Sequence, residues 1–263
     1  MITHPAYGVL RPVTPFASVL LENNPNQMTL DGTNSWVLRA PGADDCVIVD
    51  PGHEDVEHLS TLAAQTPVAS IVVTHHHADH LEGARWLGER VGAGVRALDP
   101  ALCVDAEPLS DGGLVEAGGL AVRVWHTPGH TADSVCLAVS HDGISAVLTG
   151  DTVLGRGTTV IDHPGGRLGD YLASLRRLAA VAPGTVVLPG HGPDLPDLAV
   201  TAAEYLAHRE QRLDQVRAAL TRLGPDASAR AVVEVVYADV DRALWVPAEW
   251  SVRAQLAYLR QEG

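Results

Sequence analysis

Residues 74–80 gather more metal-ligand side chains than any other stretch of the chain, reading THHHADH directly after an apolar, β-branched run. In an extended turn alternate side chains point the same way, so His75 and His77 can hold one metal ion. Asp79 and His80 follow where a helix is expected to begin, and they point to an adjacent position. Neutral imidazole and carboxylate are the ligands that suit zinc and its borderline neighbours. The run therefore predicts a metal site.

Three further ligand-type residues come after apolar runs, at glycine turns. They are His130 in TPGHT, Asp151 in LTGD and His191 in LPGHG. A single histidine at a turn usually serves packing, but the four positions together have no common packing rationale. We expect all of them to join one metal centre. His76 is the exception: neighbouring residues in an extended turn face opposite sides, so we expect it to face outward and bind no metal.

The elements that must position these residues alternate between strands and helices up to about residue 190. β-Branched runs bounded by Gly, Pro and Asp predict the strands, and apolar residues at helical spacing predict the helices. The predicted strands are Ser35–Arg39, Cys46–Asp50, Ser70–Thr74, Val95–Leu98, Leu120–Trp125, Ser134–Val139, Ser145–Thr149 and Thr185–Leu188. The predicted helices are Glu54–Ala64, Leu81–Val91 and Asp170–Val181. This order indicates a layered α/β architecture rather than an all-β barrel.

The character of the sequence changes after GPDLP at residues 192–196, where long helical patterns replace the strands. These predicted helices are Asp197–Leu223, one that Ser228 caps and that starts at Ala229, and a last one opened by Pro247–Glu249. Residues 201–263 carry 8 arginines against 9 acidic residues, so nearly all the net charge of −14 lies before them. We predict a catalytic domain over residues 1–196 and a small helical module over residues 197–263.

The composition excludes several other kinds of chemistry. All 18 basic residues among the 263 are arginine, so neither a Schiff-base lysine nor a P-loop lysine is present. The charge of −14 argues against bulk nucleic-acid binding, and we expect no double-stranded DNA partner. Three scattered cysteines are too few for a disulfide framework or a zinc knuckle. Neither a signal-peptide pattern nor an apolar run of membrane-helix length is present, so we expect a cytoplasmic protein without a membrane partner.

The motifs THHHADH, PGHT, TGD and PGHG resemble those of the metallo-β-lactamase superfamily, over roughly residues 30–195. The resemblance implies an α/β (α+β) fold, a four-layer αββα sandwich with the site at one edge, and two metal ions. The implied ligands are His75, His77 and His130 for the first ion, Asp79, His80 and His191 for the second, and Asp151 bridging both.

The implied cofactor is zinc, two ions per chain, with manganese or iron as alternatives. Such a metal pair shares a hydroxide that attacks the scissile bond. Asp79 and Asp151 are the carboxylates that the resemblance brings into catalysis. Asp50, which ends an apolar run before Pro51-Gly52, is expected to orient a ligand histidine from behind it, or else to cap a turn.

Further stretches are similar to the β-lactamase-like protein 2 group over nearly the whole chain. These stretches are the loop at 23–34, GTTV at 157–160, GDYLxSL at 169–175 and AHRExR at 207–212. The similarity implies a winged-helix-like C-terminal module. It also implies hydrolysis of single-stranded RNA, as in eukaryotic members, or of an acyl thioester, as in polyketide-pathway relatives. The residues expected near substrate are Asn34, Thr158, His208 and Arg209, with turn formation or a solvated helix face as the other reading of each.

Two other activities stay open beside this one. A glyoxalase-II-like thiolester hydrolase shares the metal motifs, but its glutathione site uses basic residues including lysine. A persulfide dioxygenase binds a single iron and leaves the second-site positions unused, whereas here they are all good ligands. The charge of −14 disfavours tight RNA binding, although Arg209, Arg212, Arg217 and Arg222 along one predicted helix partly offset it. The substrate therefore stays open between an RNA phosphodiester and a small-molecule acyl thioester, and the oligomeric state is undetermined.

Overall fold

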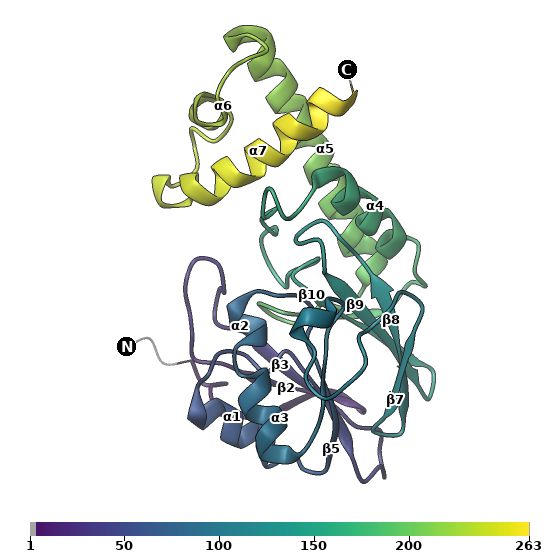
Figure 1. The fold of residues 1–263 in the computed structure, drawn as a ribbon. Coiled ribbons are helices and arrows are strands. Elements are labelled where there is room, and N and C mark those ends of the chain that lie inside the picture. Colours follow the sequence, from purple (N-terminus) through teal and green to yellow (C-terminus); the bar gives the residue numbers. More distant parts are fainter. Residues whose placement is uncertain (1–3, 263) are drawn as a thin grey trace.

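The computed structural model describes residues 4–262, which form two β-sheets packed face to face with helices on their outer sides (Figure 1). The first sheet has the strand order β1-β2-β3-β4-β5-β6 and the second has β11-β10-β9-β8-β7. The strands of the first are β1 Arg11–Thr14, β2 Ala17–Leu21, β3 Asn34–Leu38, β4 Cys46–Val49, β5 Val68–Val72 and β6 Val95–Arg96. Those of the second are β7 Leu114–Ala117, β8 Leu120–His126, β9 Val135–His141, β10 Ile144–Gly150 and β11 Val186–Pro189.

Three apolar clusters hold four layers together. Side chains of both sheets, such as Trp36 and Leu137, meet between them. The outer face of the first sheet packs on α1 and α3, and that of the second packs on α4 and α5. The helices are α1 Val56–Ala63, α2 Ala78–Leu81, α3 Ala84–Val91, α4 Leu168–Ala179, α5 Leu198–Leu223, α6 Ala229–Val236 and α7 Trp245–Glu262, with 3-10 turns at Pro100–Leu102 and Arg242–Leu244. The predicted αββα sandwich is confirmed.

Each of the eight predicted strands corresponds to a strand of the structure, but β1, β2 and β7 were not predicted. β1 and β7 are edge strands, and β1 shows no alternation of buried and exposed residues and contains Pro12, which an edge strand tolerates. β2 lies between β1 and β3, and all five of its residues pair with β3. These strands extend the sheets without contributing a ligand.

The predicted helix Leu81–Val91 is wrong as a single element, because the chain forms two helices there. α2 ends at Leu81 and α3 starts at Ala84, with Gly83 between them. A Cβ at Gly83 would lie 2.6 Å from the carbonyl oxygen of His53 and 2.7 Å from Leu59 Cδ2. The break therefore lets the chain pass close to α1, and it leaves α2 as a short turn that carries two of the predicted ligands.

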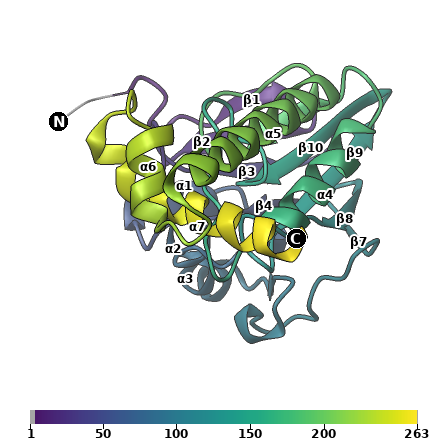
Figure 2. The same cartoon turned by 90° about the horizontal axis from the view of Figure 1, so that it is seen from above.

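The C-terminal helices extend away from the sandwich, and α5 joins the two parts (Figure 1). Leu198, Ala202 and Tyr205 of α5 pack with α4, whereas Val216 and Ala219 pack with α6 and α7. Figure 2 shows α5 beside α4, in agreement with their many residue contacts. The Ser228 hydroxyl caps α6 as predicted, accepting from the Ala231 amide. Within residues 4–262, no helix has the length and apolar character that spanning a membrane requires.

Candidate metal centre

The seven ligand-type residues converge at one edge of the sandwich, each in the segment that follows a strand. The strands and the residues after them are β5 with His75, His77, Asp79 and His80, β8 with His130, β10 with Asp151, and β11 with His191. Two backbone hydrogen bonds join ligand-bearing turns to strands of the other sheet. The Val135 amide donates to Thr74 O at 2.9 Å, and the Asn34 amide donates to Gly190 O at 2.8 Å.

The first set of ligands, His75, His77 and His130, has its ring nitrogens turned toward one point. His77 Nδ1 lies 3.1 Å from His75 Nε2 and 3.1 Å from His130 Nε2. One carboxylate oxygen of Asp151 joins them, and the four ligand atoms all lie within 4.8 Å of one another. Three imidazoles and a carboxylate around one point make a four-ligand site of the kind that zinc occupies.

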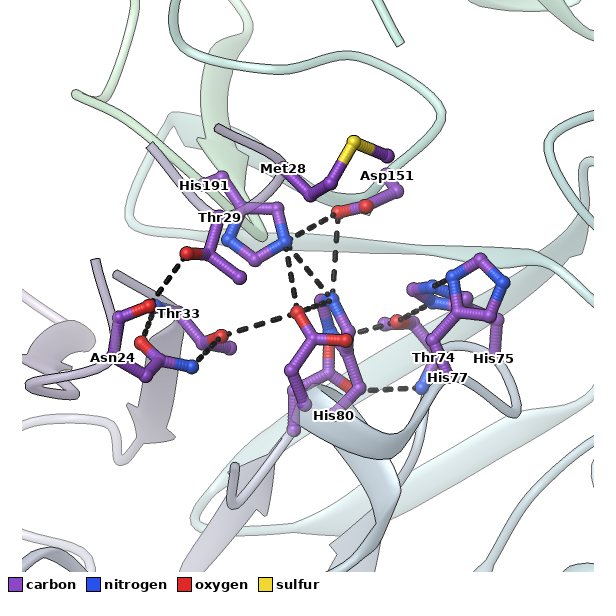
Figure 3. Close-up of polar contacts among 12 residues, drawn as sticks. Asn24, Met28, Thr29, Thr33, Thr74, His75, His77, His80, Asp151 and His191 are labelled. Atoms are coloured by element: carbon purple, nitrogen blue, oxygen red, sulfur yellow. Dashed lines mark hydrogen bonds and ion pairs between the residues drawn. The ribbon is translucent and has the colours of Figure 1, made fainter. Parts of the chain in front are cut away.

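The second set consists of Asp79, His80 and His191, whose ligand atoms lie within 4.8 Å of one another. Figure 3 shows the contacts of His80 and His191 with Asp151. His191 Nε2 is 3.2 Å from Asp79 Oδ2 and 3.3 Å from His80 Nε2. His80 Nε2 is 3.4 Å from the same oxygen of Asp79. Thr33 fixes Asp79 from behind, because its hydroxyl donates to Oδ2 at 3.3 Å.

Asp151 stands between the two sets and gives one oxygen to each. Its Oδ1 lies 3.4 Å from His191 Nε2 and 3.5 Å from His80 Nε2, while Oδ2 lies 3.7 Å from His130 Nε2. Oδ1 is buried and accepts no hydrogen bond from the described residues. A buried carboxylate needs a positive charge beside it. In the metal-free site the protonated His80 and His191 supply that charge, and bound metal ions would replace it. The residues present therefore fit a pair of metal ions bridged by this side chain.

The ring nitrogens that face away from the two sets each have a partner. His130 Nδ1 donates to Val160 O at 2.6 Å, and His191 Nδ1 donates to Gly32 O at 3.1 Å. His77 Nε2 lies 3.5 Å from Asp162 Oδ2. Such partners fix which nitrogen carries the proton, and they leave the other nitrogen free to bind a metal.

Asp50 lies behind the two sets and is hydrogen-bonded to His80 and Thr74. Its Oδ2 accepts from His80 Nδ1 at 2.9 Å and from the Thr74 hydroxyl at 2.7 Å, and its Oδ1 accepts from the Thr74 amide. Thr74 Oγ1 lies in turn 3.1 Å from His75 Nδ1. Asp50 adopts a left-handed backbone with φ of 52°, a strained conformation that is typical of functional sites.

In the metal-free site, burial and neighbouring charges leave some histidines neutral and others protonated. Burial lowers the pKa of His130 to about 4, so this imidazole is neutral. Burial would also lower the pKa of His80, but three carboxylates, of which Asp50 has the largest effect, raise it to about 9. Burial would raise the pKa of Asp151, yet the charges of His191 and His80 hold that pKa well below its usual range. The second set thus carries protons that a bound cation would displace.

Two glycines let the ligand loops approach each other. A Cβ at Gly190 would lie 2.7 Å from Asp151 Oδ1 and 2.8 Å from His80 Cε1. A Cβ at Gly150, where φ is +46°, would lie 2.7 Å from Thr74 Oγ1. Any side chain at either position would occupy the space of a ligand or of its support.

The residues predicted near substrate fall into two groups, and the structure corrects two of them. Asn34 is buried, and its amide donates to Pro189 O at 3.0 Å and to Gly192 O at 2.8 Å, so it holds the turn that carries His191. Arg209 is only 3% exposed, and its guanidinium donates to Thr159 O. Neither side chain is free to contact a substrate.

The other predicted contacts keep accessible surface. Thr158 is exposed and His208 is half-buried, with its Nδ1 lacking a hydrogen-bond partner among the described residues. Their substrate roles stay predictions. His76 belongs to neither set: its side chain is 44% exposed and its Nδ1 lies 2.7 Å from Asp133 Oδ1. A ring nitrogen of His76 also lies within 4.8 Å of ligand atoms of His77 and Asp162, so its exclusion from metal binding stays a prediction.

Several groups at the site were not predicted from the sequence. Thr33 and Asn24 belong to a loop that was singled out as a whole, and Asn24 accepts from the Thr33 amide at 2.8 Å. Met28, from the same loop, has 43% of its surface exposed and is among the residues labelled in Figure 3. Asp162 carries no local sequence signal, because it lies in a loop of its own far from the histidine run.

The sequence and the fold of this chain are similar to those of known proteins. Residues 28–191 match the model of the metallo-beta-lactamase superfamily, and residues 228–263 match that of the beta-lactamase associated winged helix domain. The beta-lactamase-like protein 2 homolog of Drosophila melanogaster is 31% identical over 93% of this chain and 87% of its own length. An atrochrysone carboxyl ACP thioesterase of Aspergillus fumigatus is 29% identical over 80% of this chain and 67% of its own. A crystal structure of a beta-lactamase domain protein from Burkholderia ambifaria has a TM-score of 0.80 at 27% identity, covering 99% of this chain and 91% of that one.

Proposed function

This chain belongs to the metallo-β-lactamase superfamily, and we propose that it is a two-metal hydrolase whose substrate is an acyl thioester. The observation that carries the two-metal part is Asp151, whose two oxygens face two complementary sets of ligands. A site for one ion needs no such bridge. This arrangement also favours a hydrolase over the alternative of a mononuclear iron persulfide dioxygenase.

We propose zinc for both ions, with manganese or iron as alternatives. Of the seven ligands, five are imidazoles and two are carboxylates, a mixture that suits zinc and its borderline neighbours. When bound, the metals would supply a water activated near neutral pH and would polarise the scissile carbonyl. Asp79 and Asp151 would then orient that water by accepting its hydrogens, since the Thr33 hydroxyl and the surrounding histidines fix both carboxylates.

The contacts of the arginines on α5 favour a thioester over RNA. Of the four arginines that the sequence lines up on one helix, Arg209 is buried and Arg217 is paired with Asp214. Arg212 lies 4.6 Å over the Tyr237 ring and donates to Val236 O. A phosphate backbone is bound mainly by free basic side chains. Three of these four arginines contact other groups of the protein, so they are less available to bind RNA.

Two further observations support an acyl substrate. The exposed side chain of Met28 offers an apolar surface on the loop that also carries Thr33, whose hydroxyl donates to Asp79. An acyl chain rather than a phosphate would gain by contact with such a surface. The similarity to an acyl-carrier-protein thioesterase points the same way. A glyoxalase-II-like use of glutathione is less consistent with a chain that has no lysine.

A side-by-side assay tests the proposal. The zinc-loaded protein is incubated with an acyl-pantetheine thioester, with the matching oxygen ester, with single-stranded RNA and with a β-lactam. We expect the thioester to be hydrolysed fastest, and Asp151→Ala to abolish that hydrolysis while His76→Ala retains it. RNA cleavage that depends on Asp151, without thioester hydrolysis, would overturn the thioester assignment and would leave the two-metal site intact.

A further inference from the structure

The segment of residues 151–162, called here the connecting segment, supplies three groups to the metal centre. It starts with the bridging Asp151. Near its end, the Val160 carbonyl accepts from His130 Nδ1 at 2.6 Å, and the Asp162 carboxylate lies 3.5 Å from His77 Nε2. Two of the three histidines of the first set are thus oriented by this one segment.

The connecting segment contains no strand or helix, so tertiary contacts must fix its path. Its first half is held by tyrosines. Tyr205 on α5 accepts from the Leu154 amide at 3.1 Å through its hydroxyl, which also lies 3.2 Å from Leu154 O. The Tyr171 hydroxyl on α4 donates to Thr152 O at 2.8 Å.

The second half is held by Arg209, one helical turn after Tyr205 on the same face of α5. The Arg209 guanidinium donates to Thr159 O, the carbonyl next to the one that His130 uses, and lies 5.1 Å over the Tyr171 ring. With only 3% of its surface exposed, Arg209 is almost completely shielded from solvent. Burying a guanidinium is unfavourable unless its contacts compensate, so the bond to Thr159 is a fixed part of the fold.

We infer that Arg209 is a positioning residue for the first metal ion: through Thr159 it fixes the connecting segment, and through Val160 and Asp162 that segment orients His130 and His77. Without this anchor, the Val160 carbonyl would be held less firmly against His130 Nδ1, although the Asp162 amide would still donate to His130 O, at 3.0 Å in the structure. The loss of partners behind a ligand histidine typically weakens metal binding by about 10–100-fold. The inference rests on the two-metal site of the proposed function but not on its substrate.

The test of this inference measures metal binding rather than hydrolysis, because the inference concerns the metal site and not the substrate. Zinc affinities of the full-length protein are determined for both ions by competition with a chromogenic chelator, and the cobalt-substituted protein is followed by its absorption spectrum. Arg209→Ala should weaken one of the two ions by about 10–100-fold and change the same cobalt bands as His130→Ala. Arg209→Lys, which retains a donor for Thr159, should recover part of the affinity. Asp162→Asn should weaken the same ion by a smaller factor.

Arg212→Ala is the matched control, because Arg212 lies on the same helix but contacts α6 and its own helix and not the connecting segment. It should bind both ions as the unaltered protein does.

The inference is overturned by any of three results. These are normal binding of both ions by folded Arg209→Ala, an equal loss of affinity for both ions in that variant, and the same behaviour in Arg212→Ala. Should Arg209→Ala fail to fold, the lysine and Asp162→Asn variants decide, and normal affinity for both ions in these two overturns it. An unaltered protein that binds two ions but hydrolyses no thioester refutes the proposed substrate and leaves this inference standing.

Discussion

Replacing Asp151 by alanine removes the one side chain that both sets of ligands share. The carboxylate lies 3.4–3.7 Å from the metal-facing nitrogens of His191, His80 and His130, and its side chain is only 11% exposed. The loss therefore acts on both ions, whereas the loss of His75, for example, would act on one.

The size of the effect follows from the charge that the site must handle. Removing one group that stabilises transition-state charge typically lowers kcat by about 10²–10³-fold. Since Asp151 serves both ions, we expect its loss to lower kcat by at least about 10²-fold, equivalent to about 2.7 kcal/mol at 1.36 kcal/mol per factor of ten. Metal content should fall as well, because the two sets lose their common ligand.

The assay compares Asp151→Ala with His76→Ala on the preferred substrate, with metal content measured for each. His76 belongs to the same histidine run, but it is in neither ligand set and its Nδ1 lies 2.7 Å from Asp133 Oδ1. Its replacement should change kcat by no more than about twofold. If the two variants have similar kcat and similar metal content, the bridging role of Asp151 is refuted.

The remaining predictions concern the metals, the protons and the space at the site. Chelation should abolish hydrolysis, and elemental analysis should give up to two metal ions per chain; full activity with no bound transition metal would contradict the site. Because the pKa of His80 is raised to about 9, its protonated form stabilises the metal-free fold below pH 6.5, and this contribution is lost as the pH rises through 9. A metal must displace that proton, so the affinity for one of the two ions should rise with pH between 6 and 8, by up to about tenfold per unit for each proton released, as calorimetry in buffers of different ionisation enthalpy would test. Gly190→Ala should reduce metal content in a folded protein, since the added Cβ would lie 2.7 Å from Asp151 Oδ1; normal metal content would show that the loop can adjust. Asp50→Ala should weaken the binding of both ions, because Asp50 holds His80 directly and His75 through Thr74, and an unchanged affinity for both would refute its supporting role.

The ligand residues could be predicted from the sequence because each is a chemically distinctive side chain in a short segment after a strong strand signal. A glycine turn after β10 or β11 leaves little freedom in where the next side chain lies, so His191 and Asp151 could be placed beside the histidine run. The strands that were missed, β1, β2 and β7, contribute no ligand, and two of them lie at sheet edges. Their absence from the prediction therefore did not affect the site.

The supporting residues could not be predicted in the same way. Val160 acts through its backbone carbonyl, which no sequence pattern identifies. Asn34 and Arg209 carry polar groups that are typical of substrate contacts, and only the packing of the Gly192 turn and of the connecting segment against them determines that they are buried. Helical spacing places Arg209 on one face of α5 but cannot say what covers that face.

The position of Arg209 also bears on how the two parts of the chain depend on each other. The change in composition near residue 196 predicts a boundary there, with all seven ligands before it. Yet Tyr205 and Arg209, which fix the connecting segment, lie after it on the helix that begins the C-terminal module. A chain ending at the predicted boundary would keep every ligand and lose the contacts that hold Leu154 and Thr159. The ligands of the first ion would then lack their outer support, so the metal centre depends on α5 although α5 contributes no ligand to it.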